Sequence, residues 1–397
     1  MIGLSLGLGL RGAGGFSPAS WFTSGGQGVW YDPSDLTTMF QDHQGVTPVS
    51  GAGQTVGLML DKRIGTRVEV FSDANVTFSG PAGYAERVST GVYRFCSDAG
   101  GIGSVVFGGL TSGKSYLVEM TVAAYDGAVS GITGLRADFF SALGIGIRSA
   151  VFAAGVCRFY YKADGTSFLA RAGGGGLGAK ISSISIKEVA GNHALQTGAT
   201  SLRPLLQQDA GGRYYILFDG TDDFLVTSAI DFTGTNKMSV FAGVRKLNDT
   251  DRGMIAELDA SAATAGKFGL SGPDFAGQAS YGVILNGATG STYYQHQTFT
   301  APVSNVISAN LDISGASRSA NIQTRINGAA NTSGGGGSGT GLGGGNFGNH
   351  ALYIGRRGGT TLPFNGRLYG LIVRGAASTA TEIAQAESWM NSKTGAY

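Results

Sequence analysis

An aromatic cluster in the last third of the chain is the stretch whose side chains could bind a sugar. Tyr293, Tyr294, Gln295 and His296 follow a Gly-Ser-Thr run, and no denser group of this kind lies outside an obvious core pattern. Sugar rings present apolar C–H faces edged with hydroxyl groups, which suit aromatic faces beside hydrogen-bonding groups. We therefore predict that Tyr293, Tyr294 and His296 bind carbohydrate. The alternative is that they are strand residues packing inside a β-sheet structure.

Three aspartates, Asp219, Asp222 and Asp223, could supply oxygen ligands to calcium. Aspartates also form turns by accepting bonds from nearby backbone amides, and we interpret them as turn residues while leaving calcium open. A transition metal needs His or Cys at ligand spacing. The chain has no Cys-x-x-Cys pair, and its four histidines are scattered: His43, His193, His296 and His350. We predict no metal site and no cofactor.

A phosphate-loop pattern, GxxxxGK[ST], runs from Gly108 to Ser115. The pattern binds phosphate only when a helix follows the lysine, because the helix N-terminus points its amides at the anion. Residues 116–122 instead alternate apolar and polar in the manner of a strand, so we interpret the run as a hairpin turn. The chain has 28 basic and 26 acidic residues with no basic block, which argues against a nucleic-acid partner.

The composition favours a turn-dense β-protein of more than one domain. The chain has 397 residues, of which 69 are glycine and 8 are proline, and 14% are charged. Charged residues usually make up about 25% of a chain and glycine about 7%. The glycines have no three-residue period, which excludes collagen. We predict an all-β fold in three parts: residues 1–63, 64–190 and 191–397.

The first part begins with a strict two-residue alternation. Its large aliphatic side chains would lie on one side of a strand, with almost no side chain on the other; they are Ile2, Leu4, Leu6, Leu8 and Leu10. We predict that this segment packs into a partner or into sister copies of the chain, with an internal edge strand as the alternative. A secretory leader would need basic residues and a longer apolar run. The chain also has no run of the about 18 apolar residues that span a membrane.

Two runs in this region carry a resemblance. Trp30-Tyr-Asp-Pro-Ser-Asp-Leu36 is followed by Gly57-Leu-Met-Leu-Asp-Lys62. The pair resembles a segment near the start of tailed-bacteriophage and prophage virion proteins. The resemblance implies a virion location and partners among other virion proteins, contacted through residues 1–63, with Trp30 and Tyr31 as anchor residues. Such appendages are usually homo-oligomers, most often trimers.

In residues 64–190, strand-like runs alternate with Gly-bearing turns, and this pattern predicts a β jelly roll. Gly109-Leu-Thr-Ser-Gly-Lys-Ser-Tyr-Leu-Val118 and the late run Ile181-Ser-Ser-Ile-Ser-Ile-Lys-Glu188 resemble family 4/9 carbohydrate-binding jelly rolls. The two cysteines, Cys96 and Cys157, lie in strand-like contexts. They are interpreted as buried thiols, and a disulfide between them is left open.

Residues 191–397 predict a second sandwich. Residues 213–228 are interpreted as strand, turn and strand, and with 352–355 and 367–374 they resemble the first and last strands of laminin-G-like or concanavalin-like sandwiches. A single long helix closes the chain, with a capping box from Thr379 to Glu382 and a glycine cap at Gly395.

The concanavalin-like resemblance also implies a test for catalysis. Retaining glycanases of that fold place acids at alternate strand positions, and Glu257 and Asp259 match the first two. Ser261 stands where the second glutamate belongs, so the required carboxyl pair, about 5 to 5.5 Å apart, is incomplete. We predict no catalytic residues and no enzyme activity.

Together these features predict a bacteriophage virion protein on the particle exterior. It would be a fibre, spike or decoration subunit that attaches by its N-terminal region and displays lectin-like modules to host glycans. Two alternatives are kept: a capsid or tail component that only contacts neighbouring virion proteins, and a polysaccharide depolymerase.

Overall fold

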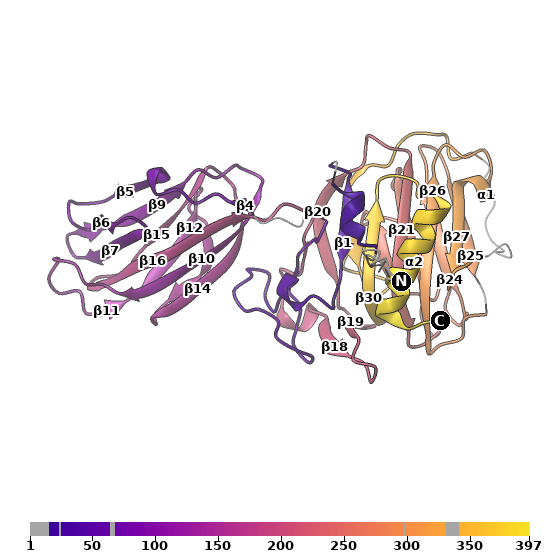
Figure 1. The fold of residues 1–397 in the computed structure, drawn as a ribbon, viewed down its shortest axis with the longest axis horizontal. Helices are drawn as coiled ribbons and strands as arrows, with labels where there is room; N and C mark the ends of the chain where they lie inside the picture. Colours follow the sequence, from indigo (N-terminus) through magenta and orange to yellow (C-terminus); the bar gives the residue numbers. More distant parts are fainter. Residues whose placement is uncertain (1–15, 24, 64–67, 297, 331–340) are drawn as a thin grey trace, which may run out of the picture.

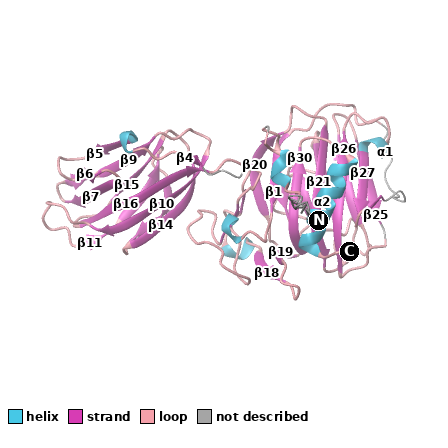
Figure 2. Cartoon of the chain, in the orientation of Figure 1, coloured by secondary structure: helices cyan, strands magenta, loops and turns pink. Residues whose placement is uncertain are grey.

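The computed structural model describes residues 16–23, 25–63, 68–296, 298–330 and 341–397. The predicted all-β class is confirmed: strands dominate both lobes of the molecule, and one long helix lies at the C-terminus (Figures 1 and 2). The predicted assembly residues Ile2, Leu4, Leu6, Leu8 and Leu10 lie outside the described residues.

Two antiparallel sheets form the larger lobe. Sheet A has the order β18 (Leu205–Gln208), β19 (Tyr214–Asp219), β30 (Asn365–Arg374), β21 (Lys237–Lys246), β26 (Val303–Asp312), β27 (Ile322–Ile326) and β28 (Ala329–Ala330), and β1 (Gly28–Tyr31) also pairs with β30. Sheet B has the order β2 (Met39–Phe40), β3 (Leu58–Met59), β17 (Ala194–Leu195), β20 (Leu225–Asp231), β29 (Asn349–Ile354), β22 (Met254–Leu258), β23 (Lys267–Ser271), β24 (Tyr281–Asn286) and β25 (Ser291–His296).

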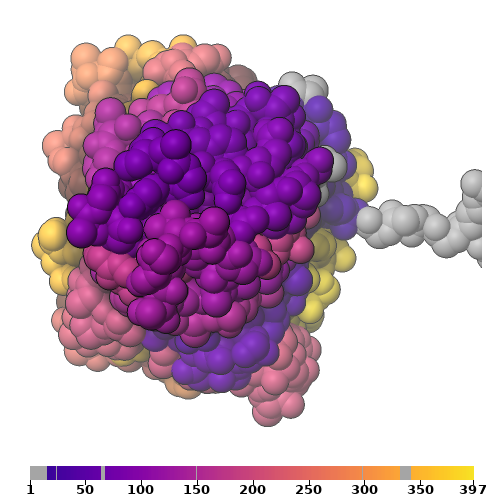
Figure 3. Space-filling view, turned by 90° about the vertical axis from the view of Figure 1, so that its left-hand side faces the viewer, coloured from indigo at the N-terminus to yellow at the C-terminus, as the bar shows by residue number. Residues whose placement is uncertain are grey.

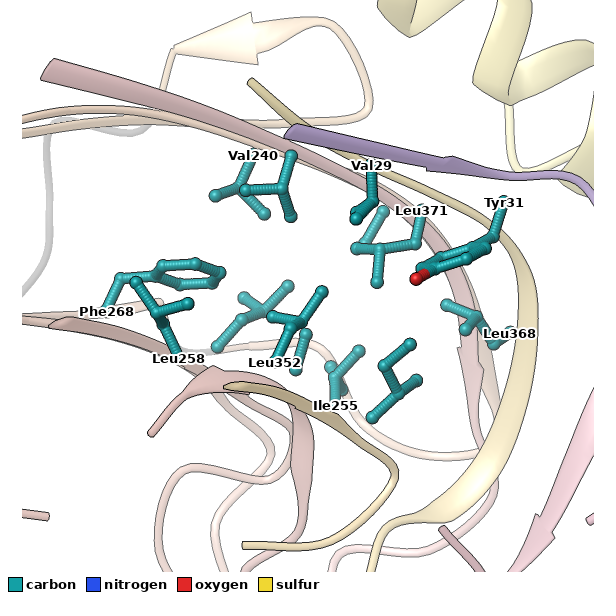
Figure 4. Packing of buried hydrophobic residues seen from close by; sticks show 14 of the residues in the cluster. Val29, Tyr31, Val240, Ile255, Leu258, Phe268, Leu352, Leu368 and Leu371 are labelled. Carbon is teal, nitrogen blue, oxygen red and sulfur yellow. The ribbon is translucent and has the colours of Figure 1, made fainter. Parts of the chain in front are cut away.

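The core of the larger lobe lies between these two sheets. Val240 and Leu371 of sheet A face Leu258, Phe268 and other side chains of sheet B (Figure 4). Strand residues alternate between the two faces of a sheet, so each strand contributes every second side chain to this layer. The runs interpreted as the first and last sandwich strands are neighbours in sheet A, where Ile216 of β19 lies opposite Leu368 of β30.

Residues 28–62 belong to this sandwich, whereas the sequence assigned them to a separate N-terminal region ending at residue 63. Strand β1 pairs with the second half of β30, alongside the position that β19 occupies against its first half. Val29 and Tyr31 point into the core and are fully buried (Figure 4). The alternation of residues 28–31 identifies a strand but not its partner, because β30 lies more than 330 residues further along the chain.

Helix α2 (Ala380–Thr394), the predicted closing helix, covers the outer face of sheet A (Figure 1). Thr379 and Glu382 form the capping box, and Gly395 adopts a left-handed φ of 59° at the C-terminal cap. Met390 packs in a small apolar layer with Trp30 and Phe241. A short helix, α1 (Arg318–Asn321), and four 3-10 turns complete the helical structure of the described residues: Pro18–Trp21, Leu36–Thr38, Asp73–Asn75 and Thr200–Leu202. No helix in the described part of the chain has the length and apolarity to cross a membrane.

Two further sheets form the smaller lobe. Sheet C has the order β14 (Gly155–Lys162), β10 (Ser115–Ala124), β16 (Leu177–Glu188), β7 (Val92–Asp98) and β6 (Ala85–Ser89), with β4 (Val68–Glu69) and β11 (Gly134–Leu135) on β16 and β8 (Gly101–Ile102) on β7. Sheet D has the order β13 (Gly146–Val151), β12 (Ala137–Ser141), β15 (Ser167–Arg171), β9 (Ser104–Gly108) and β5 (Val76–Ser79).

Aromatic side chains fill the space between sheets C and D. The ring centroids of Phe159 in sheet C and Phe168 in sheet D lie 5.6 Å apart, and Phe107 stacks on Phe168 at 5.0 Å. The Gly108–Ser115 loop joins β9 of sheet D to β10 of sheet C, so it connects two sheets and is not the hairpin turn that the sequence suggested. A strand follows its lysine, as predicted.

The two cysteines are free and buried. Cys157 lies on β14 and Cys96 on β7, with β10 and β16 between them in sheet C. Three strand spacings of about 4.8 Å separate the two residues by at least about 14 Å, too far for a disulfide. Burial also raises the pKa of the Cys157 thiol to about 11, although Arg148 lies beside it and favours the thiolate.

The two lobes meet at a joint formed by the two segments that connect them, near residues 61 and 192. Figure 3, which looks along the long axis, shows the smaller lobe in front of the larger one. At the joint, Asp61 Oδ2 accepts a bond from the Asn192 amide at 2.8 Å, and the Asp61 amide donates to His193 Nδ1 at 3.0 Å. Tyr160 of the smaller lobe packs with Phe40 of the larger one.

Candidate functional site

The predicted sugar-binding cluster lies on β25, the edge strand of sheet B, and its side chains point to opposite faces. Tyr294 and His296 point inward, with exposed fractions of 8% and 0%. Their rings lie 5.2 Å apart, and His296 Nε2 is 2.6 Å from Thr324 Oγ1 of sheet A. These contacts are those of strand residues packing within the sandwich. Tyr294 also forms part of the wall of a cavity of ≈ 420 Å³, which borders on Ala330, beyond which the chain is not described.

Tyr293 points the other way, onto the outer face of sheet B. Its ring centroid lies 6.3 Å from that of Phe275, with the rings at 66° to each other. The Arg252 guanidinium carbon lies 5.4 Å from the centre of the Phe275 ring. Phe275 is 40% exposed and Tyr293 is half-buried. We call Arg252, Phe275 and Tyr293 the aromatic platform.

Local structure fixes the platform. The hairpin of β24 and β25 places Tyr293 directly opposite Ile284. After β23, Asp274 Oδ1 accepts a bond from Ser271 Oγ at 2.7 Å and forms an ion pair with Arg252 Nη2 at 3.2 Å. These two contacts hold the loop that carries Phe275. The Asp274 carboxyl group occupies the space where a side chain at Gly282 would stand, so a residue larger than glycine would displace it.

Polar side chains border the platform. The Gln295 amide, on the same face as Tyr293, donates to the side-chain oxygen of Gln278. Aromatic rings beside amide and guanidinium groups can hold the apolar face of a sugar ring and its hydroxyl groups together. Of the three predicted sugar-binding residues, the structure therefore brings Tyr293 alone to this outer face.

The two acids considered for glycoside hydrolysis are occupied by ion pairs. Glu257 is fully buried and contacts the equally buried Lys267 ammonium, and Arg357 Nε donates to its second carboxylate oxygen at 2.7 Å. Asp259 lies just beyond the end of β22, has a φ of 88°, and pairs with His350 Nδ1 at 3.0 Å. A carboxylate without solvent access and with two cationic partners cannot attack a sugar or transfer a proton to it.

Asp219, Asp222 and Asp223 do come together, with one carboxylate oxygen of each within 4.8 Å of the others. Asp219 Oδ1 accepts from the Thr221 amide at 2.8 Å, and Asp223 Oδ2 accepts from the Asp219 amide at 3.0 Å. Burial and the two neighbouring carboxylates raise the pKa of Asp223 to about 7. These bonds are those of a turn, and the turn carries the chain from sheet A to sheet B rather than closing a hairpin.

The predicted anchor residues Trp30 and Tyr31 are inside the larger lobe. Trp30 is 7% exposed and lies edge-on to Trp389 of α2 at 5.8 Å. The Tyr31 hydroxyl donates to the Asn192 carbonyl, and burial, with Asp61 nearby, raises the pKa of this phenol well above its ordinary value. Both side chains hold the sandwich together, and their surfaces are not available to a second protein.

No protein-family model and no curated protein matches the chain. Among solved structures, the botulinum neurotoxin serotype G binding domain is similar at a TM-score of 0.37 and 12% identity, over 52% of this chain and 49% of that one. The CBM40 of the Ruminococcus gnavus IT-sialidase is similar at a TM-score of 0.30 and 13% identity, over 38% of this chain and 83% of that one. The chain thus spans about half the length of the toxin domain. Likeness at these levels carries no argument about function.

Sequence reasoning missed Arg252 and Phe275. They lie 41 and 18 residues before Tyr293, in loops with no aromatic clustering of their own. The signal that could have found them is the alternation within β25, which predicts that Tyr293 faces away from Tyr294 and needs its own neighbours.

Proposed function

We propose that this chain is a non-catalytic, glycan-binding subunit on the exterior of a bacteriophage particle. The observation that supports glycan binding is the aromatic platform, where Phe275 is 40% exposed on the outer face of sheet B and Tyr293 lies beside it. An exposed aromatic pair bordered by a guanidinium group and two amides is a surface that suits a sugar ring.

The non-catalytic part of the proposal follows from the two acids. Glu257 is neutralised by Lys267 and Arg357, and Asp259 is paired with His350. Neither carboxylate lies free in a cleft that could hold a glycosidic bond between them. The protein would therefore hold a polysaccharide without cutting it.

The virion part of the proposal rests on the two sequence runs at residues 30–36 and 57–62, which resemble virion proteins of tailed phages. Both runs lie within the larger lobe in this structure, so the attachment surface would be formed by the segment before residue 16. Attachment by that segment, a virion-exterior location and a homotrimer are parts of the proposal.

Binding of the whole chain to an array of bacterial surface glycans tests this function. Tyr293→Ala and Phe275→Ala should each weaken binding by about tenfold, since one aromatic contact with a ligand contributes on the order of 1 kcal/mol or more. Phe152→Ala is the matched control, because Phe152 is an exposed aromatic residue, at 65%, on the other lobe. Tyr294→Ala is unsuitable as a test, because Tyr294 is a core residue.

The same array separates the alternatives. If the chain binds none of the host surface polysaccharides, glycan binding is rejected and a purely structural virion component is favoured. Release of reducing sugar from a bound polysaccharide would reject the non-catalytic assignment and favour a depolymerase.

A further inference from the structure

A second polar surface lies on sheet A, on the opposite side of the larger lobe from the aromatic platform. It is a groove of ≈ 470 Å³ beside the C-terminal end of α2. Four strands and the loop before β19 contribute its main side chains. We call these residues the arginine groove: Arg213, Tyr215, Arg245, Ser304, Arg367 and Tyr369.

The register of the sheet places positive charges next to one another in this groove. Arg245 on β21 lies directly opposite Arg367 on β30, and like charges at such positions repel. Arg213 enters from the loop that precedes β19. Of the described residues that line the groove, Asp209 is the one acid. Its Oδ2 lies 3.9 Å from Arg213 Nη1, and its Oδ1 accepts a bond from the Arg213 backbone amide at 3.0 Å. The groove therefore carries a net charge of about +2, from three guanidinium groups and one carboxylate.

The central guanidinium groups have unused donors. Arg245 donates to Ser304 Oγ at 3.3 Å, but its Nε has no hydrogen-bond acceptor among the described residues. The Nε of Arg367 likewise has none, and both nitrogens are buried from solvent. Each arginine offers its donors as a planar fork, which matches the two oxygens of a carboxylate.

Two tyrosines hold the arginines in place. The Arg367 guanidinium carbon lies 4.5 Å from the centre of the Tyr215 ring, and the Tyr215 and Tyr369 rings lie 5.2 Å apart. The Tyr369 hydroxyl donates to Asp209 Oδ2 at 3.3 Å. Both tyrosines are buried, so they serve to orient Arg367 rather than to stack on a ligand. A pre-oriented guanidinium loses less freedom when it binds an anion.

From this arrangement we propose that the arginine groove binds the carboxylate of an acidic saccharide. The carboxylate would lie between Arg245 and Arg367. Ser304, and Gln208 of β18, which also lines the groove, would bond to hydroxyl groups of the sugar. A groove of ≈ 470 Å³ has room for a small oligosaccharide segment. That the ligand is a saccharide rests on the proposed function, whereas its negative charge follows from the groove alone.

One feature of the groove opposes an anion. Thr394 and Gly395 border it, and the carbonyl groups at the end of α2 carry a partial negative charge equivalent to about half an electron. The three positive charges of the guanidinium groups exceed the sum of this partial negative charge and the negative charge of Asp209. Binding should therefore weaken as salt is raised, because the interaction is electrostatic and open to solvent.

Calorimetric titration of the whole chain tests the proposal. The probes are a panel of oligosaccharides bearing uronic or sialic acids, each paired with its carboxyl-reduced form. We expect the acidic form to bind at least tenfold more tightly than its reduced partner. Arg245→Gln and Arg367→Gln should each remove about tenfold or more of that affinity, since each deletes a charged hydrogen bond. Both variants should keep or raise the thermal midpoint, because they relieve the repulsion between adjacent guanidinium groups, and a merely structural role would lower it.

Lys237→Gln is the matched control. It removes one positive charge from the same strand, β21, at the end remote from the groove, where Lys237 pairs with Asp312 at 2.9 Å. Its affinity for the acidic probe should remain within twofold of the original.

Several outcomes would overturn the proposal. Equal binding of acidic and carboxyl-reduced probes would reject it and leave glycan binding intact. If both arginine variants still prefer the acidic probe and Tyr293→Ala does not bind it, the anion binds at the aromatic platform and not in the arginine groove. Tighter binding of a glutamate-rich peptide through the same arginines would replace the saccharide by a protein partner. A panel in which nothing binds rejects the groove, and it rejects the proposed function as well only if the glycan array is also silent.

Discussion

At the scale of single residues, the outer face of sheet B contains a buried ionic group that serves stability and not chemistry. Glu257 and Lys267 are both fully buried and in contact, and Arg357 closes the second side of the carboxylate. Burial lowers the pKa of Lys267, while Glu257 beside it opposes that change. The ammonium is tolerated inside the protein because its partner is a carboxylate.

Glu257→Gln should therefore destabilise the protein strongly. The change leaves the Lys267 charge buried without a counter-charge, which costs about 3 to 5 kcal/mol. Urea denaturation measures the loss. Glu119→Gln is the control, because Glu119 pairs with Arg158 at the surface and such pairs contribute about 0 to 1 kcal/mol. Equal effects of the two changes would contradict the structural role given to Glu257.

At the scale of elements, helix α2 can pack closely on sheet A because glycines stand beneath it. A side chain at Gly243 or Gly370 would collide with Met390. Because these two strand positions have no side chain, the helix can lie close to the sheet. The helix in turn buries Trp30 and Phe241.

The capping box makes a separate contribution to this element. Thr379→Ala removes the hydroxyl group that caps the Glu382 amide and should cost about 1 kcal/mol, whereas the backbone amide of residue 379 and Arg374 still bond to the Glu382 carboxylate. Thermal unfolding measures it, with Thr381→Ala, an exposed position in the first turn, as the control. A larger loss in the control than in Thr379→Ala would show that the cap does not stabilise the helix.

At the scale of the whole molecule, the joint between the lobes depends on a buried carboxyl group. Burial raises the pKa of Asp61 to about 6, although Arg63 and three backbone amides lower it. In the unfolded chain the pKa is about 3.9. The folded state thus holds this proton more tightly, so the stability it contributes is fully present below about pH 3.9 and is lost as the pH rises through about 6.

Comparison with Asp61→Asn isolates this effect from other titrating groups. The stability of the original protein relative to the variant should be greater at pH 4 than at pH 7, by about 1 to 3 kcal/mol. Thermal unfolding measured across that range tests it. A difference between the two proteins that stays constant with pH would contradict the raised pKa.

Assembly is a second property of the whole molecule. Deletion of residues 1–15 should abolish self-association or attachment to virion proteins, because the sequence predicts that this segment packs into a partner or into sister copies of the chain. Light scattering and co-sedimentation measure this. Assembly that persists after the deletion would reject the role proposed for the N-terminal segment.

The fold class and the local elements could be predicted from the sequence, because alternation and turn residues act over a few positions. Residues 213–228 and 367–374 were predicted to contain strands, and β19 (214–219), β20 (225–231) and β30 (365–374) lie there; the α2 capping box and the strand after Lys114 were predicted as well. The strand partners could not be predicted in the same way, since pairing across 300 residues leaves no local pattern. Pairing placed Trp30 and Tyr31 inside the larger lobe, separated Tyr293 from Tyr294, and brought Arg245 beside Arg367, so the residues available to a ligand were fixed by contacts between distant segments.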